Sequence, residues 1–188
     1  RYEIGEQFGE GGVGLVYRAL DRKLGRDAAV KVMRGELSDH SALRPRFEQE
    51  AGALVALVHP NIVTINDYGL LGESPYIVME LLSGQTLRQE LDRGPMAENR
   101  AFDIALQLLH GLAYAHAQGV AHRDLKPSNI FLQTFPTQPD VVKILDFGFV
   151  AFLDDKDGER NELAEQDMGF GTPSYMPPEQ IRGEVARQ

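Results

Sequence analysis

The sequence has no cysteine among its 188 residues, and its charges are predominantly negative. The absence of cysteine excludes a disulfide framework and a thiolate metal site, and it is compatible with a reducing compartment. A net charge of −9, from 28 acidic and 19 basic side chains, disfavours a broad basic surface of the kind that binds nucleic acid. Any phosphate group that this protein handles must therefore be bound by a few local residues.

A long apolar run is also missing. No segment approaches the roughly 18 to 20 apolar residues that cross a bilayer, and residues 1–4 lack the apolar core of a secretory signal. We therefore expect a cytoplasmic protein with no membrane contact in this chain, which leaves a membrane anchor beyond residue 188 open. The chain starts on strand-like sequence and stops without a terminating signal, so we expect it to be part of a longer protein.

The first third of the chain contains short β-prone runs. Residues 2–8, 15–20 and 27–33 are separated by glycine or charged turns, which predicts a small antiparallel sheet. A helix is expected next, because apolar residues recur at spacings of three and four until Pro60. Its shared face comprises Leu43, Phe47, Glu50, Leu54 and Leu57.

A boundary between two parts of the chain is expected near residue 82. Two apolar runs, 62–67 and 75–82, lead to a polar connector at 83–85. We therefore divide the chain into residues 1–82 and 83–188.

The second part is expected to be mainly helical. A long buried helix is predicted at 99–118, and Gly119 supplies a natural stop. The polar segment 133–140, with two prolines, is expected to be a loop before a short strand at 141–145. The apolar stripe of the predicted helix comprises Phe102, Ala105, Leu108, Leu109, Leu112 and Ala113.

A glycine-rich stretch lies between the first two predicted strands. Unhindered backbone amides there could close over the phosphates of a nucleotide. A strand, rather than a helix, follows at 15–18, so the stretch does not fit a dinucleotide-binding fingerprint. On its own it fits a plain hairpin equally well. It reads Gly9, Glu10, Gly11, Gly12, Val13 and Gly14.

Strand alternation places Lys31 on the same face as Ala29, within an otherwise apolar strand. Glu50, the acid on the apolar face of the predicted helix, is its expected partner, because either charge would be costly to bury alone. The pair could be a plain buried salt bridge, or it could hold the lysine ready for phosphate oxygens. We favour the second interpretation.

Four polar functional groups are concentrated in residues 122–129, directly after the long predicted helix. Asp124 could accept a hydroxyl proton, Lys126 could neutralise charge on a moving phosphoryl group, and Asn129 could bind a metal through its amide oxygen. Asp146 ends the next buried strand and is expected beside this loop as a further magnesium ligand. These residues together indicate phosphoryl transfer.

The motifs resemble those of eukaryotic-like, Hanks-type serine/threonine protein kinases, closest to the bacterial members. The resemblance covers the whole chain and implies an α+β, bilobal protein-kinase-like fold. Residues 1–82 would be an N-lobe with a small β-sheet, the glycine-rich loop and one regulatory helix. Residues 83–188 would be the hinge end and a partial, mainly helical C-lobe with the catalytic loop and activation segment. The matching motifs are the glycine-rich stretch with Val16, Lys31, Glu50, His122-Arg123-Asp124, Asp146-Phe147-Gly148 and Pro178-Glu179.

The resemblance also implies roles for single residues. Lys31 would hold the α and β phosphates of ATP and pair with Glu50, while Asp124 would be the catalytic base. Asn129 and Asp146 would bind Mg²⁺, which Mn²⁺ could replace. The adenine pocket and hinge implied in the same way comprise Val16, Ala29, Met79, Glu80, Leu82 and Phe131.

The substrate is expected to be a protein. Lys126 and the segment 171–173 resemble serine/threonine rather than tyrosine kinases, and small-molecule kinases of the aminoglycoside type are not expected to carry the segment 171–179. We expect transfer from ATP to protein serine or threonine hydroxyls, no nucleic-acid partner, and leave regulatory dimerisation open. The competing interpretation is a truncated or pseudokinase-like module that binds nucleotide or partners without turnover.

One segment departs from the family pattern. Residues 149–170 contain no serine, threonine or tyrosine, whereas seven acidic residues lie there. In the family, the equivalent of Arg123 commonly pairs with a phosphorylated residue, so one hypothesis is that a carboxylate takes that place. The other interpretation is a solvated, charge-rich loop.

Overall fold

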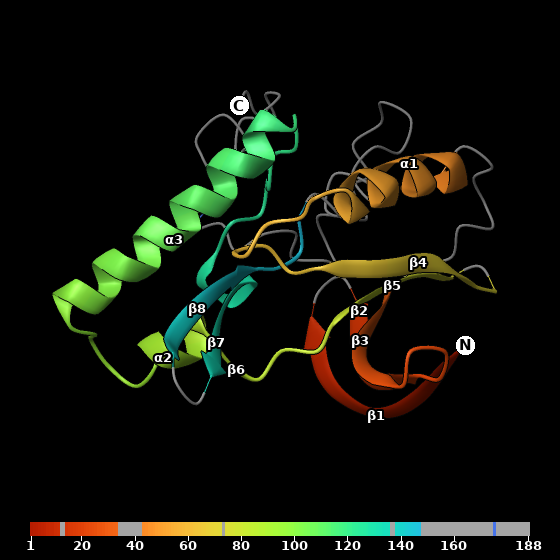
Figure 1. Ribbon diagram of the computed structural model, residues 1–188, viewed down its shortest axis with the longest axis horizontal. Helices are drawn as coiled ribbons and strands as arrows, with labels where there is room; N and C mark the ends of the chain where they lie inside the picture. The colour runs from red at the N-terminus through yellow and green to blue at the C-terminus, as the bar shows by residue number, and fades with distance from the viewer. Residues whose placement is uncertain (12–13, 34–42, 73, 136–137, 148–174, 176–188) are drawn as a thin grey trace, which may run out of the picture. The chain divides into compact units, whose positions relative to one another are not determined.

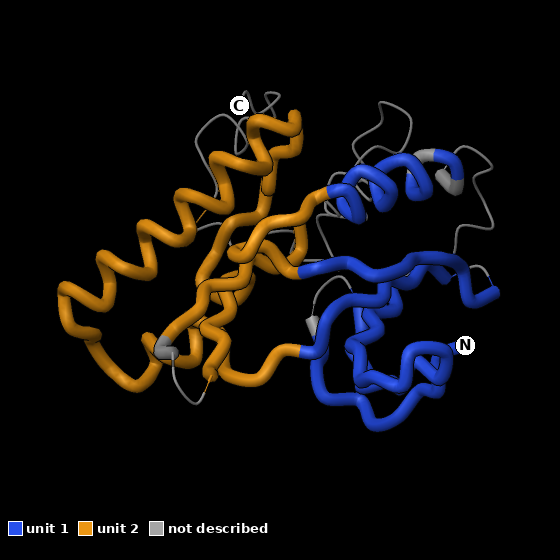
Figure 2. Tube along the Cα trace, in the orientation of Figure 1, with its two compact units in different colours: residues 1–56, 64–81 blue, residues 57–63, 82–188 orange. Residues whose placement is uncertain are grey.

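The computed structural model describes residues 1–11, 14–33, 43–72, 74–135, 138–147 and 175. The chain divides into two compact units, which Figure 2 colours separately. The first unit comprises residues 1–56 and 64–81, and the second comprises residues 57–63 and 82–188. Among the described residues, no helix combines the length and the apolar content that a membrane crossing needs.

The first unit contains a five-stranded antiparallel sheet with the strand order β1-β2-β3-β5-β4, and one helix, α1 (Figure 1). The three strands predicted from the first third of the sequence are confirmed. One face of the sheet buries Ala19, Ala28, Val30 and Val78 as an apolar cluster. The elements are β1 (Tyr2–Gly11), β2 (Gly14–Asp21), β3 (Arg26–Met33), α1 (Leu43–Val55), β4 (Ile65–Leu71) and β5 (Ser74–Glu80).

The helix α1 covers the opposite face of this sheet. Lys31 lies directly across from Val16 on one side and from Ile77 on the other, and Ile77 lies across from Tyr68. Directly opposed residues in antiparallel strands point to the same face. The ring of Phe47 in α1 meets the ring of Tyr68 edge-on, with 5.9 Å between centroids. The helix therefore packs on the face that carries Lys31.

The two edge strands of this sheet are joined at one end. The guanidinium of Arg1 binds both Asp21, at 3.0 Å, and Asp67 in β4, at 2.7 Å. The hydroxyl of Tyr2 also donates to Asp67, at 2.8 Å. Asp21 is buried, and its hydrogen bond from Arg1 lowers the pKa of its carboxyl group. The ion pair and the hydrogen bond with Asp67 thus hold the start of β1 against β4.

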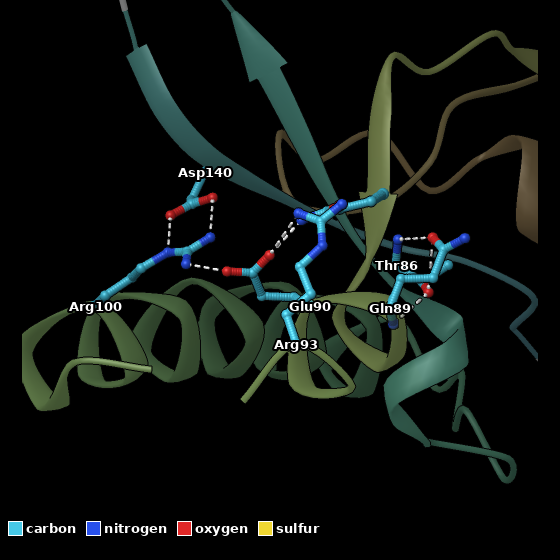
Figure 3. Close-up of polar contacts among 7 residues, drawn as sticks. Thr86, Gln89, Glu90, Arg93, Arg100 and Asp140 are labelled. Carbon is cyan, nitrogen blue, oxygen red and sulfur yellow. Dashed lines mark hydrogen bonds and ion pairs between the residues drawn. The ribbon is translucent and has the colours of Figure 1, made fainter. Parts of the chain in front are cut away.

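The second unit contains a three-stranded sheet with the order β6-β7-β8 and two helices. The long predicted helix is confirmed as α3. The short helix α2 begins with a capping box, in which the hydroxyl of Thr86 accepts from the N–H of Gln89 while the Gln89 side chain accepts from the N–H of Thr86 (Figure 3). The elements are β6 (Gly84–Thr86), α2 (Leu87–Leu91), α3 (Glu98–Ala117), a 3₁₀ turn (Pro127–Asn129), β7 (Ile130–Phe135) and β8 (Gln138–Ile144).

The predicted buried stripe of α3 is wrong for most of its members, although Leu108 packs against the buried cluster and Leu112 is partly buried. Phe102 is 71% exposed and Leu109 is 61% exposed, whereas the residues that α3 buries are Ile104, Gly111 and Ala115. The stripe follows from periodicity alone. In the structure, the face of α3 that lies toward β8 is the one on which Ile104 packs against Val142. Apolar periodicity identifies a helix, but the neighbouring strand decides which face is covered.

The predicted loop at 133–140 is also wrong over most of its length. Residues 130–135 and 138–144 form the hairpin strands β7 and β8, with Gln133 across from Val141. The two prolines and the polar residues suggested a loop, but pairing between β7 and β8 extends almost to the turn. Residues 136 and 137 lie outside the described part of the chain.

Residues 57–63 belong to the second unit, although they precede two strands of the first. Ile62 forms a parallel bridge with Ile144 at the end of β8. The N–H of Ile144 donates to the carbonyl of Asn61 at 2.8 Å, and the N–H of Val63 donates to the carbonyl of Ile144 at 3.0 Å. These main-chain hydrogen bonds therefore hold residues 57–63 against the end of β8.

The turn in this segment predicts a pH dependence of stability. Nδ1 of His59 accepts a hydrogen bond from the N–H of Asn61 at 3.1 Å, and the ring stacks on Tyr114. Burial, followed by the positive charges of His110 and Lys143, lowers the pKa of His59. The unfolded chain takes up this proton near pH 6.5, whereas the folded chain takes it up only at lower pH, so stability falls as pH drops through that window.

The expected result is a larger loss of stability between pH 7.5 and pH 5.5 in the wild type than in a His59→Asn variant. An asparagine oxygen can accept the same N–H in a turn of this kind, but it does not titrate. Urea unfolding at the two pH values measures the difference. Equal losses in both proteins would remove His59 as the cause.

Candidate active site

The segment 122–129, here called the catalytic loop, follows α3 and is held against the residues after β8. His122 is buried, and its Nε2 lies 2.8 Å from the carbonyl oxygen of Leu145. Its Nδ1 accepts from the N–H of Asp124 at 3.3 Å, and its ring lies 4.7 Å from that of Phe147. Burial lowers the pKa of His122, which favours the neutral ring that these two contacts require.

Asp124 is held by two donors from its own loop. The ammonium of Lys126 lies 2.8 Å from Oδ2 of Asp124. The side-chain nitrogen of Asn129 donates to the same oxygen at 3.1 Å and to the carbonyl oxygen of Asp124 at 2.9 Å. The structure thus brings together Asp124, Lys126 and Asn129, as predicted from their spacing.

Asn129 also connects the loop to Asp146. Asn129 is buried, and its main-chain carbonyl oxygen accepts a hydrogen bond from the N–H of Leu145 at 2.9 Å. Asp146 follows directly, with the positive φ of 57° that a non-glycine residue seldom adopts. Such backbone strain costs about 1 to 3 kcal/mol and is concentrated at functional sites. Arg123, beside Asp124, has a similar φ of 63°.

In the first unit, the strand register gathers four of the predicted site residues on one sheet face. Lys31 lies across from Val16, and Ala29 lies across from Met79. Lys31 and Ala29 are two residues apart in β3 and therefore point the same way. Lys31 is 6% exposed, so its charge is withdrawn from solvent.

Glu50 lies on α1, which covers this same face, and its side chain is partly buried. The arrangement is compatible with the expected ion pair between Lys31 and Glu50. The pair itself stays a prediction.

The glycine-rich stretch extends from the end of β1 to the start of β2. Gly9, Glu10 and Gly11 end β1, and Gly14 begins β2. A Cβ atom on Gly14 would lie 2.2 Å from the carbonyl oxygen of Val32, so only glycine fits there. The start of β2, next to the turn of the hairpin, is therefore packed directly against the backbone of β3.

The remaining adenine-pocket residues are divided between the units. Glu80 ends β5, where its N–H donates to the carbonyl of Thr64 at 3.0 Å and its carboxylate accepts from the N–H of Thr64 at 2.8 Å. Leu82 and Phe131 belong to the second unit, and both are partly buried. A common adenine pocket that includes these residues stays a prediction.

Several predicted features lie outside the described residues. They include Gly12 and Val13 of the glycine-rich stretch and the acidic segment 149–170. The segment 171–179 is also outside, apart from Tyr175. The hypothesis of a carboxylate partner for Arg123 therefore stays open.

A set of polar contacts around β8 was not predicted from the sequence. Arg100 of α3 binds the carboxylate of Asp140 through Nε, at 2.6 Å, and Nη2, at 3.1 Å, and it also binds Glu90 of α2 (Figure 3). These contacts raise the pKa of Arg100. Gln107, seven residues along the same helix, binds β8 further on. The helix carries other polar residues as well, so its sequence provides no signal that singles out Arg100 or Gln107.

The comparisons with known proteins agree with this arrangement. A family model described as protein kinase domain matches residues 2–188. The probable serine/threonine-protein kinase PknB of Bifidobacterium longum is 39% identical over 195 residues, which cover 98% of this chain and 27% of that protein. Serine/threonine-protein kinase pkn3 of Myxococcus xanthus is 40% identical over 185 residues, which cover 97% of this chain and 34% of that protein. The chain thus spans roughly a quarter to a third of these curated relatives.

Solved structures show the same fold. The kinase domain of Mycobacterium tuberculosis PknI matches with a TM-score of 0.68 and 27% identity, over 78% of this chain and 58% of that chain. Rad53 in complex with AMP-PNP matches with a TM-score of 0.68 and 34% identity, over 78% of this chain and 38% of that chain. With motifs, site geometry and relatives in agreement, the chain belongs to the protein kinase family.

Proposed function

We propose that the protein carrying this chain is a serine/threonine protein kinase, which transfers the γ-phosphoryl group of MgATP to serine or threonine hydroxyls of proteins. The observation that carries the proposal is the catalytic loop, in which Asp124 is held by Lys126 and Asn129 while Leu145 links the loop to Asp146. The names of the relatives support the same activity.

Asp124 is the residue suited to act on the attacking hydroxyl. Lys126 and Asn129 both donate to its Oδ2, which fixes the carboxylate in one orientation. Its Oδ1 is then the oxygen that would orient the hydroxyl and accept its proton. Lys126, within the same ion pair, would also reduce the negative charge that develops on the transferred group.

The donor set near Asp124 fits a magnesium ion. Because the side-chain nitrogen of Asn129 is committed to Asp124, its Oδ1 faces away from that contact. Together with the carboxylate of Asp146 it offers the hard oxygen ligands that Mg²⁺ and Mn²⁺ prefer, and Mg²⁺ usually takes only one or two carboxylates beside phosphate and water. When bound, the ion would neutralise charge on the phosphates of ATP.

The first unit is suited to hold the nucleotide. Lys31 is a buried cation on the sheet face shared with Val16, Ala29 and Met79. The amides of the glycine-rich hairpin could bind phosphate oxygens, and the small side chain of Ala29 leaves room for a flat ring. The matched Rad53 structure contains AMP-PNP, an ATP analogue, which supports ATP as the nucleotide.

The direct test is phosphate transfer by the full-length protein. Incubation with Mg²⁺, ATP labelled at the γ-phosphate and a generic protein substrate should place label on the protein, and hydrolysis should recover phosphoserine or phosphothreonine. Nucleotide binding without transfer would identify a binding module instead. Label found on tyrosine, or on a small-molecule acceptor only, would contradict the proposed substrate class.

A further inference from the structure

The strand β8 is an edge strand of its sheet, yet its outer edge is hydrogen bonded at Val142 by side chains. The N–H of Val142 donates to Oε1 of Gln107 at 3.0 Å. The carbonyl of Val142 accepts from Nδ2 of Asn61, also at 3.0 Å. Val142 is fully buried, so both groups would be costly to leave unpaired. Two side-chain amides here replace a neighbouring strand.

The two amides also bind each other. Nδ2 of Asn61 donates to Oε1 of Gln107 at 3.1 Å, and Nε2 of Gln107 donates to the carbonyl of Asp140 at 2.9 Å. Each side chain is thereby fixed in one orientation, since exchanging N and O of either amide would set donor against donor or acceptor against acceptor. We call Asn61 and Gln107 the amide pair.

The close approach of α3 to β8 depends on a glycine. A Cβ atom on Gly111, one turn beyond Gln107, would lie 2.7 Å from Cδ1 of Ile144 and 3.3 Å from Cβ of Asn61. Gly111 therefore lets the helix lie near enough for the side chain of Gln107 to reach the backbone of β8. Side chain and backbone together fix the helix on the strand.

The fixed strand leads directly to the predicted metal ligand. The carbonyl of Asn61 accepts from the N–H of Ile144, so the segment that supplies one amide also holds the last residue of β8. Leu145 is then bound through its N–H to Asn129 and through its carbonyl to His122. Asp146 is the next residue. A shift of β8 along its axis would break the amide-pair contacts and displace Asp146 against the catalytic loop.

We propose that the amide pair is a positioning element for Asp146, which sets the register of β8 so that the carboxylate and Asn129 meet one cation. The inference rests on the proposed function, because it concerns the metal ligand of that reaction. The proposed role of the amide pair is indirect, because it acts through the strand and needs no contact with nucleotide or substrate. Mutation of a residue that orients a metal ligand typically lowers metal affinity or activity by about 10- to 100-fold. Mutation of the amide pair, which is more remote from the metal, should have a smaller effect.

The test uses the full-length protein with Gln107→Met, which keeps the length of the side chain and removes its hydrogen bonds. The Mg²⁺ concentration for half-maximal phosphate transfer should rise about three- to tenfold, with little change in the KM for the protein substrate. In the protein without nucleotide or metal, amide hydrogen exchange in residues 140–147 should become faster. Asn61→Ala should give the same two changes.

The matched control is Ile104→Val, which removes one methyl group from the buried face of the same helix. It should lower the melting temperature by a few degrees and leave the Mg²⁺ requirement unchanged. A double variant, Gln107→Met with Asn61→Ala, should require no more Mg²⁺ than the worse single variant if the two act as one unit. If Gln107→Met does not fold, Gln107→Asn provides a milder change, because its amide is one methylene shorter.

Two results would overturn the inference. One is a Gln107 variant that loses thermal stability but keeps the Mg²⁺ requirement and the exchange rates of the Ile104→Val control. The other is full additivity of the two substitutions. Asp146→Asn, measured alongside, separates the inference from the proposed function: if this variant keeps normal activity, the metal role of Asp146 is wrong, whereas if it is inactive and the Gln107 variants are normal, only the positioning role fails.

Discussion

Replacing Asp124 by asparagine is expected to lower kcat for phosphate transfer by about a thousandfold, within the range typical of a lost general base. Asparagine preserves the size of the side chain, and its oxygen can still accept from Lys126 and Asn129, which bind Oδ2 of Asp124 at 2.8 and 3.1 Å. It cannot take up a proton from the attacking hydroxyl. The KM for ATP should stay within about threefold, because the residues predicted to bind the phosphates are unchanged.

The matched control for this substitution is Asp92→Asn, also in the second unit. The carboxylate of Asp92 is paired with Arg88 and largely exposed. Surface ion pairs of this kind contribute little to the stability of the fold. Steady-state kinetics of the full-length protein should show this variant within about twofold of the wild type. If Asp124→Asn kept more than a tenth of the wild-type kcat, Asp124 would not be the base.

Among the described glycines of the second unit, Gly84 is expected to show the largest loss of stability when it is replaced by alanine. Gly84 has a φ of +144°, and a Cβ atom there would lie 2.1 Å from the carbonyl oxygen of Leu132 and 3.1 Å from Cε1 of Phe131. Backbone strain alone costs about 1 to 3 kcal/mol. With the clash against β7, the free energy of unfolding should fall by more than about 3 kcal/mol, a large part of the usual 5 to 15 kcal/mol.

The Gly94→Ala variant separates the cost of backbone strain from the cost of the steric clash. Gly94 has a similar φ of +133°, but nothing lies within 4 Å of the Cβ position. Urea unfolding should therefore give a loss of about 1 to 3 kcal/mol for Gly94→Ala and a clearly greater loss for Gly84→Ala. Because Phe131 is also displaced, Gly84→Ala should raise the KM for ATP. Equal losses for the two variants would show that the contact with Leu132 is relieved by a small shift.

The chemistry of the candidate site could be predicted from the sequence because it depends on residues that are close along the chain. Asp124, Lys126 and Asn129 lie within six residues, and the structure joins them by direct contacts. The glycine hairpin follows from local turn chemistry. The strand face on which Lys31 lies, shared with Ala29, follows from strand alternation. Short sequence separation leaves few alternative arrangements.

The supports of the site could not be predicted in this way. Asn61, Gln107 and Val142 are separated by 46 and 35 residues, and only folding brings them together. Nothing in the local pattern distinguishes Gln107 from an ordinary exposed glutamine on a helix. The same limitation explains why most of the predicted stripe on α3 is exposed, because periodicity shows that a helix has faces but not which face a strand covers.

The sequence by itself therefore determined the family motifs, the first three strands of the first unit, the helix α3 and the residues expected to act on phosphate. Tertiary structure alone decided that residues 57–63 attach to β8, that two amides fix this strand, that Gly84 has no room for a side chain, and that Gly111 lies close to Ile144. The physical reason is that local patterns record the preferences of the backbone. Register and close approach are instead set by which distant groups satisfy each other's hydrogen bonds and leave room for each other's atoms.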